Sequence, residues 1–431
     1  MKDENLLILC GFLDLFSVSI LITSLPLHVK SFNVSTTYLG IFFSLYGALQ
    51  ILSSYLMGYL ADKTGKKVII CICALLTSIG YFTLGIAQSF IGIFLVRFIS
   101  GLFKQTQTLS RTILATKKIS DNNHRVVLLG RFTTLSSVGF IFGPPIGGYL
   151  YQYYGFFYIS CLSSFGFLLM FIIFLQLDVD SLSPVASESE PKPTIVIPEE
   201  TRPMNIRRRK LSDSFQEIKP TLSSLTNDDD RTYFIVKKTW DIQLAIFVLS
   251  FCPLLFRTNY SLALRDMFES TSILTGFASS YGAITGSIAG IVVPLIIQFY
   301  SSRYDPELDK VSKISINNIA ESKLLLHSSF ILALSFLGCC LAPTLTLFIL
   351  FQSPISFVNG LSREAFNLII TKRVAKKQVG RVMGTTGSLV AFGRLVAPVL
   401  GGIMQEASFR LPIFCSAALS FFATGIIFNY L

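Results

Sequence analysis

The sequence predicts an all-α membrane protein that crosses the bilayer many times and consists of two related halves. Hydrophobic residues make up 52% of the 431-residue chain and charged residues only 14%, against about 25% charged residues in a typical soluble domain. Long uncharged apolar runs follow one another along the chain. A motif rich in glycine and proline occurs twice at a fixed offset. These three observations together predict the fold class.

Twelve apolar runs are long enough, at about 20 residues, to cross the hydrocarbon core of a bilayer as helices. The first run is longer than the apolar core of a signal peptide, so we expect it to be a retained span. The seventh is the least uniform run, because it contains Pro253 and Arg257. The predicted spans are Leu6–Leu25, Tyr38–Leu60, Val68–Ala87, Phe90–Leu109, Val126–Tyr149, Phe156–Leu177, Ile242–Leu262, Leu274–Phe299, Leu324–Leu341, Leu345–Ile370, Gly380–Met404 and Leu411–Tyr430.

Basic residues collect in the loops on one side of these predicted spans. The positive-inside rule places that side, and with it both termini, in the cytoplasm. The net charge of +11 is then explained by loops that face anionic lipid, and we predict no nucleic-acid partner. On the opposite side, Asn33 begins a glycosylation sequon close to the membrane. The plasma membrane and the endolysosomal membrane both remain open as locations.

The repeated motif lies in the stretch from Gly130 to Gly148. Glycine lets a neighbouring helix approach closely in a membrane, and proline is tolerated there when neighbours satisfy the freed carbonyls. Adding 254 to five motif positions reaches an identical residue each time, whereas Gly143 corresponds to Ala397. We infer an internal duplication that maps the fifth span onto the eleventh. The five matched positions are Gly130, Gly139, Pro144, Gly147 and Gly148.

Residues 178–240 interrupt the succession of apolar runs and divide the spans six and six. The segment is rich in serine, proline and charge and has no apolar face, so we expect a mostly disordered cytoplasmic linker. Its basic tetrad Arg207–Lys210 either binds anionic lipid, serves in trafficking, or is a solvated charge run. The predicted domains are therefore an N-terminal six-helix bundle (1–177), the linker (178–240) and a C-terminal six-helix bundle (241–431).

Residues for metal binding or covalent catalysis do not occur in suitable patterns. All eight cysteines lie inside apolar runs without metal-site spacing, and there are only three histidines. The sequence contains no phosphate-binding G-x-x-x-x-G-K-[ST] loop. We therefore predict a protein that is not an enzyme and not an ATP-driven pump, with no metal site and no cofactor.

The loop between the second and third spans has a specific pattern. It matches G-x-L-A-D-[RK]-x-G-[RK]-[RK] at every position, and its carboxylate can cap a helix or pair with an arginine. An ordinary basic loop is the alternative interpretation, but the complete match resembles the signature loop of the major facilitator superfamily. Its pattern residues include Gly58, Asp62, Lys63, Gly65, Lys66 and Lys67.

Three further segments resemble the same superfamily. The Gly130–Gly148 stretch, including Gly143, matches the antiporter motif G-x8-G-x3-G-P-x2-G-G without a departure. Arg97 and Gly101 fit the buried-arginine motif of the fourth helix. Asp14, twelve residues before Pro26, resembles the drug/proton antiporter group. Short segments of the first half also resemble an animal branch of the superfamily. In the second half, the copy of the signature loop has lost its glycines, so the resemblance is strongest in the first six spans.

The resemblance implies two six-helix bundles around a central cavity, which opens alternately to either side by rocking. It also implies that the signature loop is a conformational latch, with Asp62 against the start of the eleventh span in the outward-facing state. Glycines of the fifth and eleventh spans would allow close contact with the eighth and second spans. The family does not specify the substrate.

Charges inside the membrane are the candidates for chemistry, because each costs about 2.5–3.5 kcal/mol and needs a partner or a function. Asp14 either binds and releases a proton or is permanently hydrogen-bonded to a neighbouring helix. Arg97 opposes Asp14 or a substrate anion, or it bonds backbone carbonyls of the first span. Arg394 is a candidate counterpart in the second half. Gln50 and Asn359 either line the cavity or hold helices together.

We predict a monomeric secondary transporter whose partners are a small organic solute, membrane lipid and, in a proton-coupled antiport, protons. The alternative is a transporter-fold sensor, scaffold or trafficking protein without full transport activity. The substrate, the direction of transport and the stoichiometry do not follow from the sequence.

Overall fold

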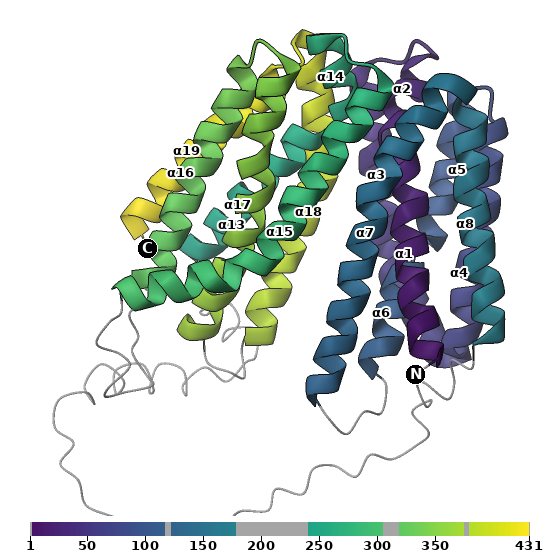
Figure 1. Ribbon diagram of the computed structural model, residues 1–431, viewed down its shortest axis with the longest axis horizontal. Coiled ribbons are helices and arrows are strands. Elements are labelled where there is room, and N and C mark those ends of the chain that lie inside the picture. Colours follow the sequence, from purple (N-terminus) through teal and green to yellow (C-terminus); the bar gives the residue numbers. More distant parts are fainter. Residues whose placement is uncertain (1, 117–121, 178–239, 305–318, 375–378, 431) are drawn as a thin grey trace, which may run out of the picture. The chain divides into compact units, whose positions relative to one another are not determined.

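The computed structural model describes residues 2–116, 122–177, 240–304, 319–374 and 379–430, and these form helices joined by short connections (Figure 1). The helices of both halves belong to one compact unit. The predicted linker, apart from Trp240, lies outside the described residues. In the first half the helices are α1 (Lys2–Ile22), α2 (Ser24–Lys30), α3 (Thr36–Thr64), α4 (Lys66–Ile86), α5 (Phe90–Phe103), α6 (Thr106–Thr116), α7 (Asn122–Tyr154) and α8 (Phe156–Gln176). In the second half they are α13 (Trp240–Arg257), α14 (Tyr260–Phe268), α15 (Ser272–Tyr304), α16 (Ile319–Leu341), α17 (Leu345–Arg373), α18 (Val379–Ala407) and α19 (Leu411–Tyr430).

Eleven stretches of the described chain are helices long and apolar enough to cross a membrane, whereas the sequence predicted twelve. The difference is the fourth predicted span, Phe90–Leu109, which is not one helix. It is divided into α5 and α6 at Lys104 and Gln105. The seventh predicted span is also interrupted, since α13 ends at Arg257 and α14 begins at Tyr260. Both interruptions occur where polar residues lie within the apolar run.

Tight glycine turns join two pairs of neighbouring helices. Gly65 separates α3 from α4 with a φ of 97°, and Gly155 separates α7 from α8 with a φ of 85°. Only glycine adopts such backbone angles without strain, so each turn reverses the chain within one residue. Below, the two ends of the helical unit are called the Gly65 end and the Gly155 end.

Most glycines of the repeated motif pack helices against each other within each half, whereas Gly148 and Gly402 pack on the backbones of Ser272 and Thr36 in the other half. A Cβ atom at Gly139 would lie 2.5 Å from the carbonyl oxygen of Phe12, so α7 and α1 are in backbone contact. In the second half, a Cβ atom at Gly401 would lie 2.7 Å from Thr258, which follows α13. The duplicated sequence therefore performs the same packing task twice.

Two related contacts join the halves. Gly40 of α3 packs on the backbone of Pro398 in α18, and Gly276 of α15 packs on the backbone of Pro144 in α7. These contacts are called the seal contacts below. A serine one turn further along adds a hydrogen bond each time: Ser44 donates to the carbonyl of Leu395, and Ser280 donates to that of Ile141. Helix pairing between the halves is thus the pairing that the family resemblance implied.

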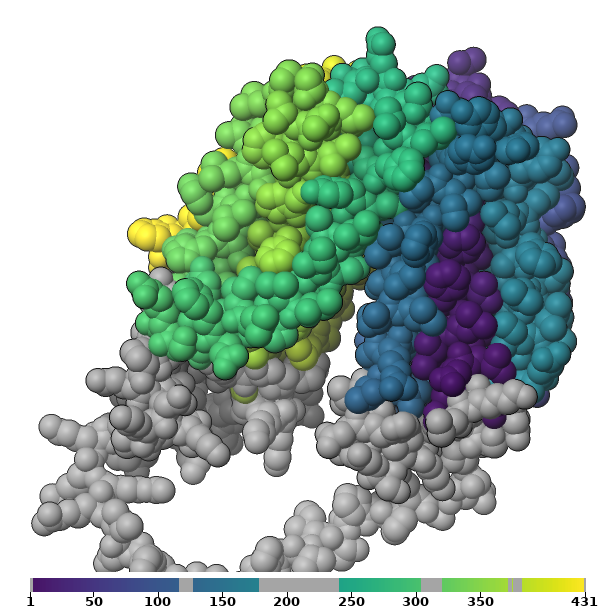
Figure 2. Space-filling view, viewed as in Figure 1, coloured from purple at the N-terminus to yellow at the C-terminus, as the bar shows by residue number. Residues whose placement is uncertain are grey.

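The seal contacts lie towards the Gly155 end, and the halves separate towards the Gly65 end. Near the Gly65 end, a Cβ atom at Gly58, Gly130 or Gly384 would meet no atom of the described residues within 4 Å. Figure 2 shows the same arrangement, with α7 and α15 touching near α14 and standing apart near the N-terminus of α1. Among the described residues, the halves are therefore in contact at the Gly155 end and apart at the Gly65 end.

Candidate functional site

A central cavity of about 1160 Å³ lies between the halves. Helices α1, α2, α3, α6 and α7 of the first half and α13, α14, α15, α17 and α18 of the second half contribute lining residues. Small residues of α15, among them Ser279, Gly282 and Gly286, leave the space that the cavity occupies. A site built from both halves changes shape when the halves move, as alternating access requires.

The charged residues among those lining the cavity are all arginines: Arg111, Arg257 and Arg363. Arg257 is exposed, although the residues on either side of it in the chain, Phe256 and Thr258, are buried. Within the described residues its guanidinium has no hydrogen-bond or ion-pair partner. Arg363 is close to Glu364 at 3.9 Å, but both side chains are largely exposed.

The interruption between α13 and α14 places Arg257 at the cavity. Asn259 adopts the left-handed conformation, with a φ of 47°, and this breaks the helix. Gln405 of α18 secures the break, because its Nε2 donates to the carbonyl of Thr258 at 2.6 Å and its Oε1 accepts from Asn259 Nδ2 at 2.8 Å. Irregular backbone at membrane depth is tolerated where it lines a cavity and its polar groups find partners.

One face of α17 presents a polar stripe to the cavity. Gln352, Ser356, Asn359 and Arg363 follow each other at helical spacing, and all four line the cavity. The amide of Gln352 is already engaged, since it accepts from the Tyr260 hydroxyl and donates to the carbonyl of Ala278 at 3.3 Å. Asn359 is exposed and has no partner among the described residues, so its amide is available to a ligand.

A separate cluster of polar residues is buried inside the first half. Asp14 of α1 is completely buried and forms an ion pair with Lys104, and it also accepts a hydrogen bond from the Thr106 hydroxyl. Lys104 additionally lies 4.9 Å from the ring centroid of Phe167. A buried carboxylate requires such compensation, because an unpaired charge in a low-dielectric interior is costly.

The break between α5 and α6 makes this pairing possible. Lys104 follows the last residue of α5 with a non-helical ψ of 64°. Gln105 compensates for the broken helix, since its Nε2 donates to Ser53 Oγ at 2.7 Å and to the carbonyl of Gln50 at 2.8 Å. An uninterrupted helix would not place Lys104, Gln105 and Thr106 in these positions together.

Arg97 lies in the same interior but does not serve Asp14 as its ion-pair partner. Its guanidinium carbon is 4.9 Å from the ring centroid of Tyr46 and 5.4 Å from that of Tyr81. Both distances are within the range of cation–π attraction. Its Nε has no hydrogen-bond partner, and Gln50 donates to the Tyr46 hydroxyl at 3.2 Å.

The structure thus brings Asp14, Gln50 and Arg97 into the interior of the first half and places Asn359 at the cavity. Asp14 and Arg97 do not line the cavity, although the neighbouring Leu15 does. Arg394 is exposed and lies outside the cavity lining. Sequence reasoning did not select Lys104 or Gln405 as site residues, and it considered Arg257 only as a gate residue or an interfacial anchor at the outer end of the seventh span. The signal for Lys104 was the run of five polar residues from 104 to 108 inside a predicted span.

The signature loop lies at the Gly65 end. Asp62 is exposed, and Lys63 Nζ lies 4.6 Å from the ring centroid of Tyr59. The side chains at the start of α18, where the latch partner was expected, are outside the described part of the structure. The latch therefore remains a prediction.

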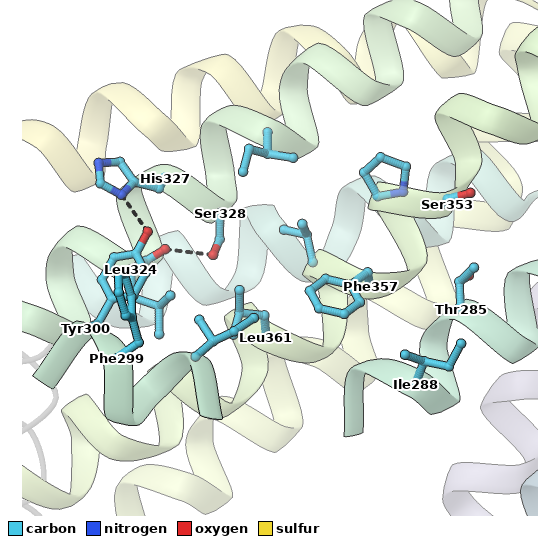
Figure 3. A pocket seen from close by; sticks show the side chains of 14 residues that line it. Thr285, Ile288, Phe299, Tyr300, Leu324, His327, Ser328, Ser353, Phe357 and Leu361 are labelled. Atoms are coloured by element: carbon cyan, nitrogen blue, oxygen red, sulfur yellow. Dashed lines mark hydrogen bonds between the residues drawn. The ribbon is translucent and has the colours of Figure 1, made fainter. Parts of the chain in front are cut away.

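A smaller side pocket of about 550 Å³ lies within the second half, between α15, α16 and α17. Figure 3 shows Tyr300 pointing towards His327 at one end of this pocket and Thr285 with Ile288 at the other. The Tyr300 hydroxyl and His327 Nδ1 are 2.8 Å apart. Its other lining residues are mostly apolar, so the central cavity is the better candidate for binding a polar solute. Among the described residues, no group of three His, Cys, Asp or Glu could hold a metal ion.

Comparison with known proteins places these features in a family. The family model described as Major Facilitator Superfamily matches residues 7–308. The quinolone resistance protein NorA of Staphylococcus aureus is 23% identical over 421 residues, which is 95% of this chain and 91% of NorA.

Solved structures share the fold at low sequence identity. An inward-facing, unoccupied bacterial homologue of the human lysosomal transporter Spinster aligns with a TM-score of 0.71 at 14% identity, over 99% of this chain and 96% of that one. The human organic anion transporter MFSD10 (TETRAN) aligns with a TM-score of 0.59 at 17% identity, over 98% of both chains.

Proposed function

Because this chain belongs to the Major Facilitator Superfamily, we propose that it is a secondary transporter that moves a small organic solute by alternating access and exchanges it for protons. One observation carries the proposal: in the described part of the chain, a central cavity is lined by both halves, which are in contact at the Gly155 end and apart at the Gly65 end. A scaffold would have no need of such a cavity. Its open, partly polar character favours transport over the sensor or scaffold function.

The proposed orientation follows from the basic loops. The positive-inside rule assigns the Gly65 end, with its lysine-rich signature loop, to the cytoplasm. The chain is then a multi-pass membrane protein with both termini in the cytoplasm, and the open cavity represents the inward-facing state. In the outward-facing state, the seal contacts would separate and Asp62 would meet the start of α18.

We assign proton binding to Asp14. In the ion pair with Lys104 the carboxylate is charged, and protonation would remove the attraction that holds Lys104 at the α5–α6 break. Leu15 lines the cavity, so α1 connects the buried pair to the solute site directly. A change at Asp14 is therefore in a position to alter the cavity wall.

Uptake into sealed proteoliposomes with an imposed pH gradient tests this proposal. A panel of radiolabelled organic anions, amines and sugars would be screened, and accumulation of at least one solute is expected to depend on the gradient. Asp14→Asn should abolish the pH dependence, and so should Asp14→Asn combined with Lys104→Met, which leaves no isolated buried charge and should insert into the membrane.

The matched control is Asp266→Asn, at an exposed residue outside the central cavity, and it should behave like the unmodified protein. Gradient-driven uptake that survives in Asp14→Asn would exclude Asp14 as the proton site. If no solute moves at all, the sensor or scaffold function becomes the better explanation.

A further inference from the structure

We propose that the central cavity binds an amphipathic organic anion, with Arg257 as the group that recognises the negative charge. This inference rests on the proposed transport function, since the cavity of a transporter is where its solute binds. The proposed substrate class is a molecule with an apolar body and one acidic group, and Arg257 selects it by its charge.

The charged side chains that line the cavity are all positive. The cavity carries three arginines, and none of its lining residues in the described part of the chain is an aspartate, glutamate or lysine. A concave surface with charge of one sign concentrates ligands of the opposite sign, because low-dielectric walls focus the field. A cationic solute would meet repulsion without any compensating carboxylate.

The guanidinium of Arg257 has no partner in the described part of the chain. A guanidinium among apolar residues is normally paired, yet this one is exposed to the cavity and has neither a salt bridge nor a hydrogen bond within the described residues. The hydroxyl of the nearby Tyr260, three residues along the chain, donates to Gln352. The planar fork of an arginine fits a carboxylate, sulfonate or phosphate with two parallel hydrogen bonds.

Hydrogen bonds from Gln405 hold the backbone next to Arg257 in place. Arg257 ends α13 at a helix break that Gln405 holds through two hydrogen bonds, to Thr258 and Asn259. The backbone carrying the guanidinium is therefore fixed before a ligand arrives, which lowers the entropic cost of binding. On the facing helix α17, the uncommitted amide of Asn359 offers a further donor for the anionic group.

The apolar part of the lining indicates what the rest of the ligand must be. Apolar side chains from both halves share the lining, including Leu15, Phe43, Leu254 and Ile284. Apolar surface buried against them contributes about 25 cal/mol per Å². A small hydrophilic anion would leave this surface unused, whereas a ring or chain bearing one acidic group uses both features.

Two sources can supply this chemistry: a soluble organic anion or a membrane lipid with an anionic headgroup. Binding of naphthalene-2-sulfonate to the purified full-length protein in neutral detergent would be measured by titration calorimetry. Neutral naphthalene-2-sulfonamide and cationic 2-naphthylmethylamine provide the charge comparison on the same ring. The sulfonate is expected to bind at least tenfold more tightly than either, since charge-assisted hydrogen bonds are worth a factor of this order.

Variants then test whether Arg257 causes the tighter binding of the sulfonate. Arg257→Gln should weaken sulfonate binding tenfold or more, Arg257→Lys should restore part of it, and Arg410→Gln at an exposed site outside the cavity should change nothing. Asn359→Asp should weaken the sulfonate and favour the amine. Equal binding of the three ligands, or full sulfonate affinity in Arg257→Gln, would overturn the proposal.

Competition separates the two sources of the anion. Displacement of the sulfonate by phosphatidylglycerol but not by phosphatidylcholine supports an anionic lipid as the ligand, and failure of both to compete supports a soluble anion. Counterflow in proteoliposomes then tests transport separately. Arg257-dependent binding without counterflow would uphold the site and refute the transport function. Counterflow of the amine without sulfonate binding would uphold the transport function and refute the anion site.

Discussion

Lys104, at the break between α5 and α6, forms an ion pair with Asp14, which is completely buried in α1. The pair joins the first span of the chain to a helix interruption that the sequence did not predict. It also connects the proposed proton site to a structural irregularity, because the break itself positions the lysine. The following predictions test this pair and the contacts that accompany it.

Removing only one partner of the pair should be more damaging than removing both. Lys104→Met leaves the Asp14 carboxylate buried without its cation, and we expect a loss of about 3–5 kcal/mol in unfolding free energy. Asp14→Asn combined with Lys104→Met should recover most of that loss, because no isolated charge remains. Denaturation in detergent, followed by circular dichroism of the helices, measures the unfolding free energies of the single and double variants.

Lys63→Met provides the control for that cycle, since Lys63 is exposed at the Gly65 end. Equal stability of Lys104→Met and Lys63→Met would show that the ion pair carries no stabilisation.

Large residues at the seal contacts should shift the conformational equilibrium. Gly40→Leu and Gly276→Leu each place a side chain against a proline backbone in the other half, so the closed Gly155 end should become less populated. A cysteine at Ser287, which lines the cavity, should then react more slowly with a maleimide applied from the Gly65 side. The matched control is Gly425→Leu, where a Cβ atom meets nothing within 4 Å; unchanged labelling in both seal variants would contradict the assignment.

Gln405 should be important for stability. Gln405→Leu removes the partners of the Thr258 carbonyl and of Asn259 Nδ2, both at a buried helix break, and the expected loss is about 2–4 kcal/mol. Thermal unfolding measures it, with exposed Gln88→Leu as the comparison. A Tm that matches the control would mean that water or a local rearrangement replaces both hydrogen bonds.

The signature loop should affect transport and not the stability of the structure described above. Asp62 is exposed in this state, so Asp62→Asn should change unfolding free energy by less than about 0.5 kcal/mol. If the latch prediction is right, the same variant should depopulate the outward-facing state and slow solute exchange. Normal exchange kinetics in Asp62→Asn would remove the latch role from this carboxylate.

The sequence predicted the repeated architecture well, because its signals are strong and local. Apolar length identified the spans, and the 254-residue offset anticipated that Gly147 and Gly401 pack in equivalent places. Family membership, inferred from the signature loop and the antiporter motif, is confirmed by the comparisons.

The helix breaks were not predicted, because average hydropathy over a 20-residue run does not register a short polar interruption. The apolar flanks of Lys104 and Arg257 concealed the change of backbone direction at each. Which cation would pair with Asp14 was equally inaccessible to sequence reasoning, since Arg97 and Lys104 are both in the fourth run. Only the three-dimensional arrangement shows Arg97 between two tyrosine rings and Lys104 at the carboxylate.

The polar stripe on α17 has a consequence for the speed of release. Gln352, Ser356, Asn359 and Arg363 are separated by three or four residues, so their spacing along the helix axis is about 4.5–6 Å. A bound group moving towards the open end would exchange one hydrogen-bonding partner for the next without passing through an interval that has none. In the proposed transport function, a solute leaving the cavity would then pass through several shallow energy minima along α17 and would not be held in one deep minimum.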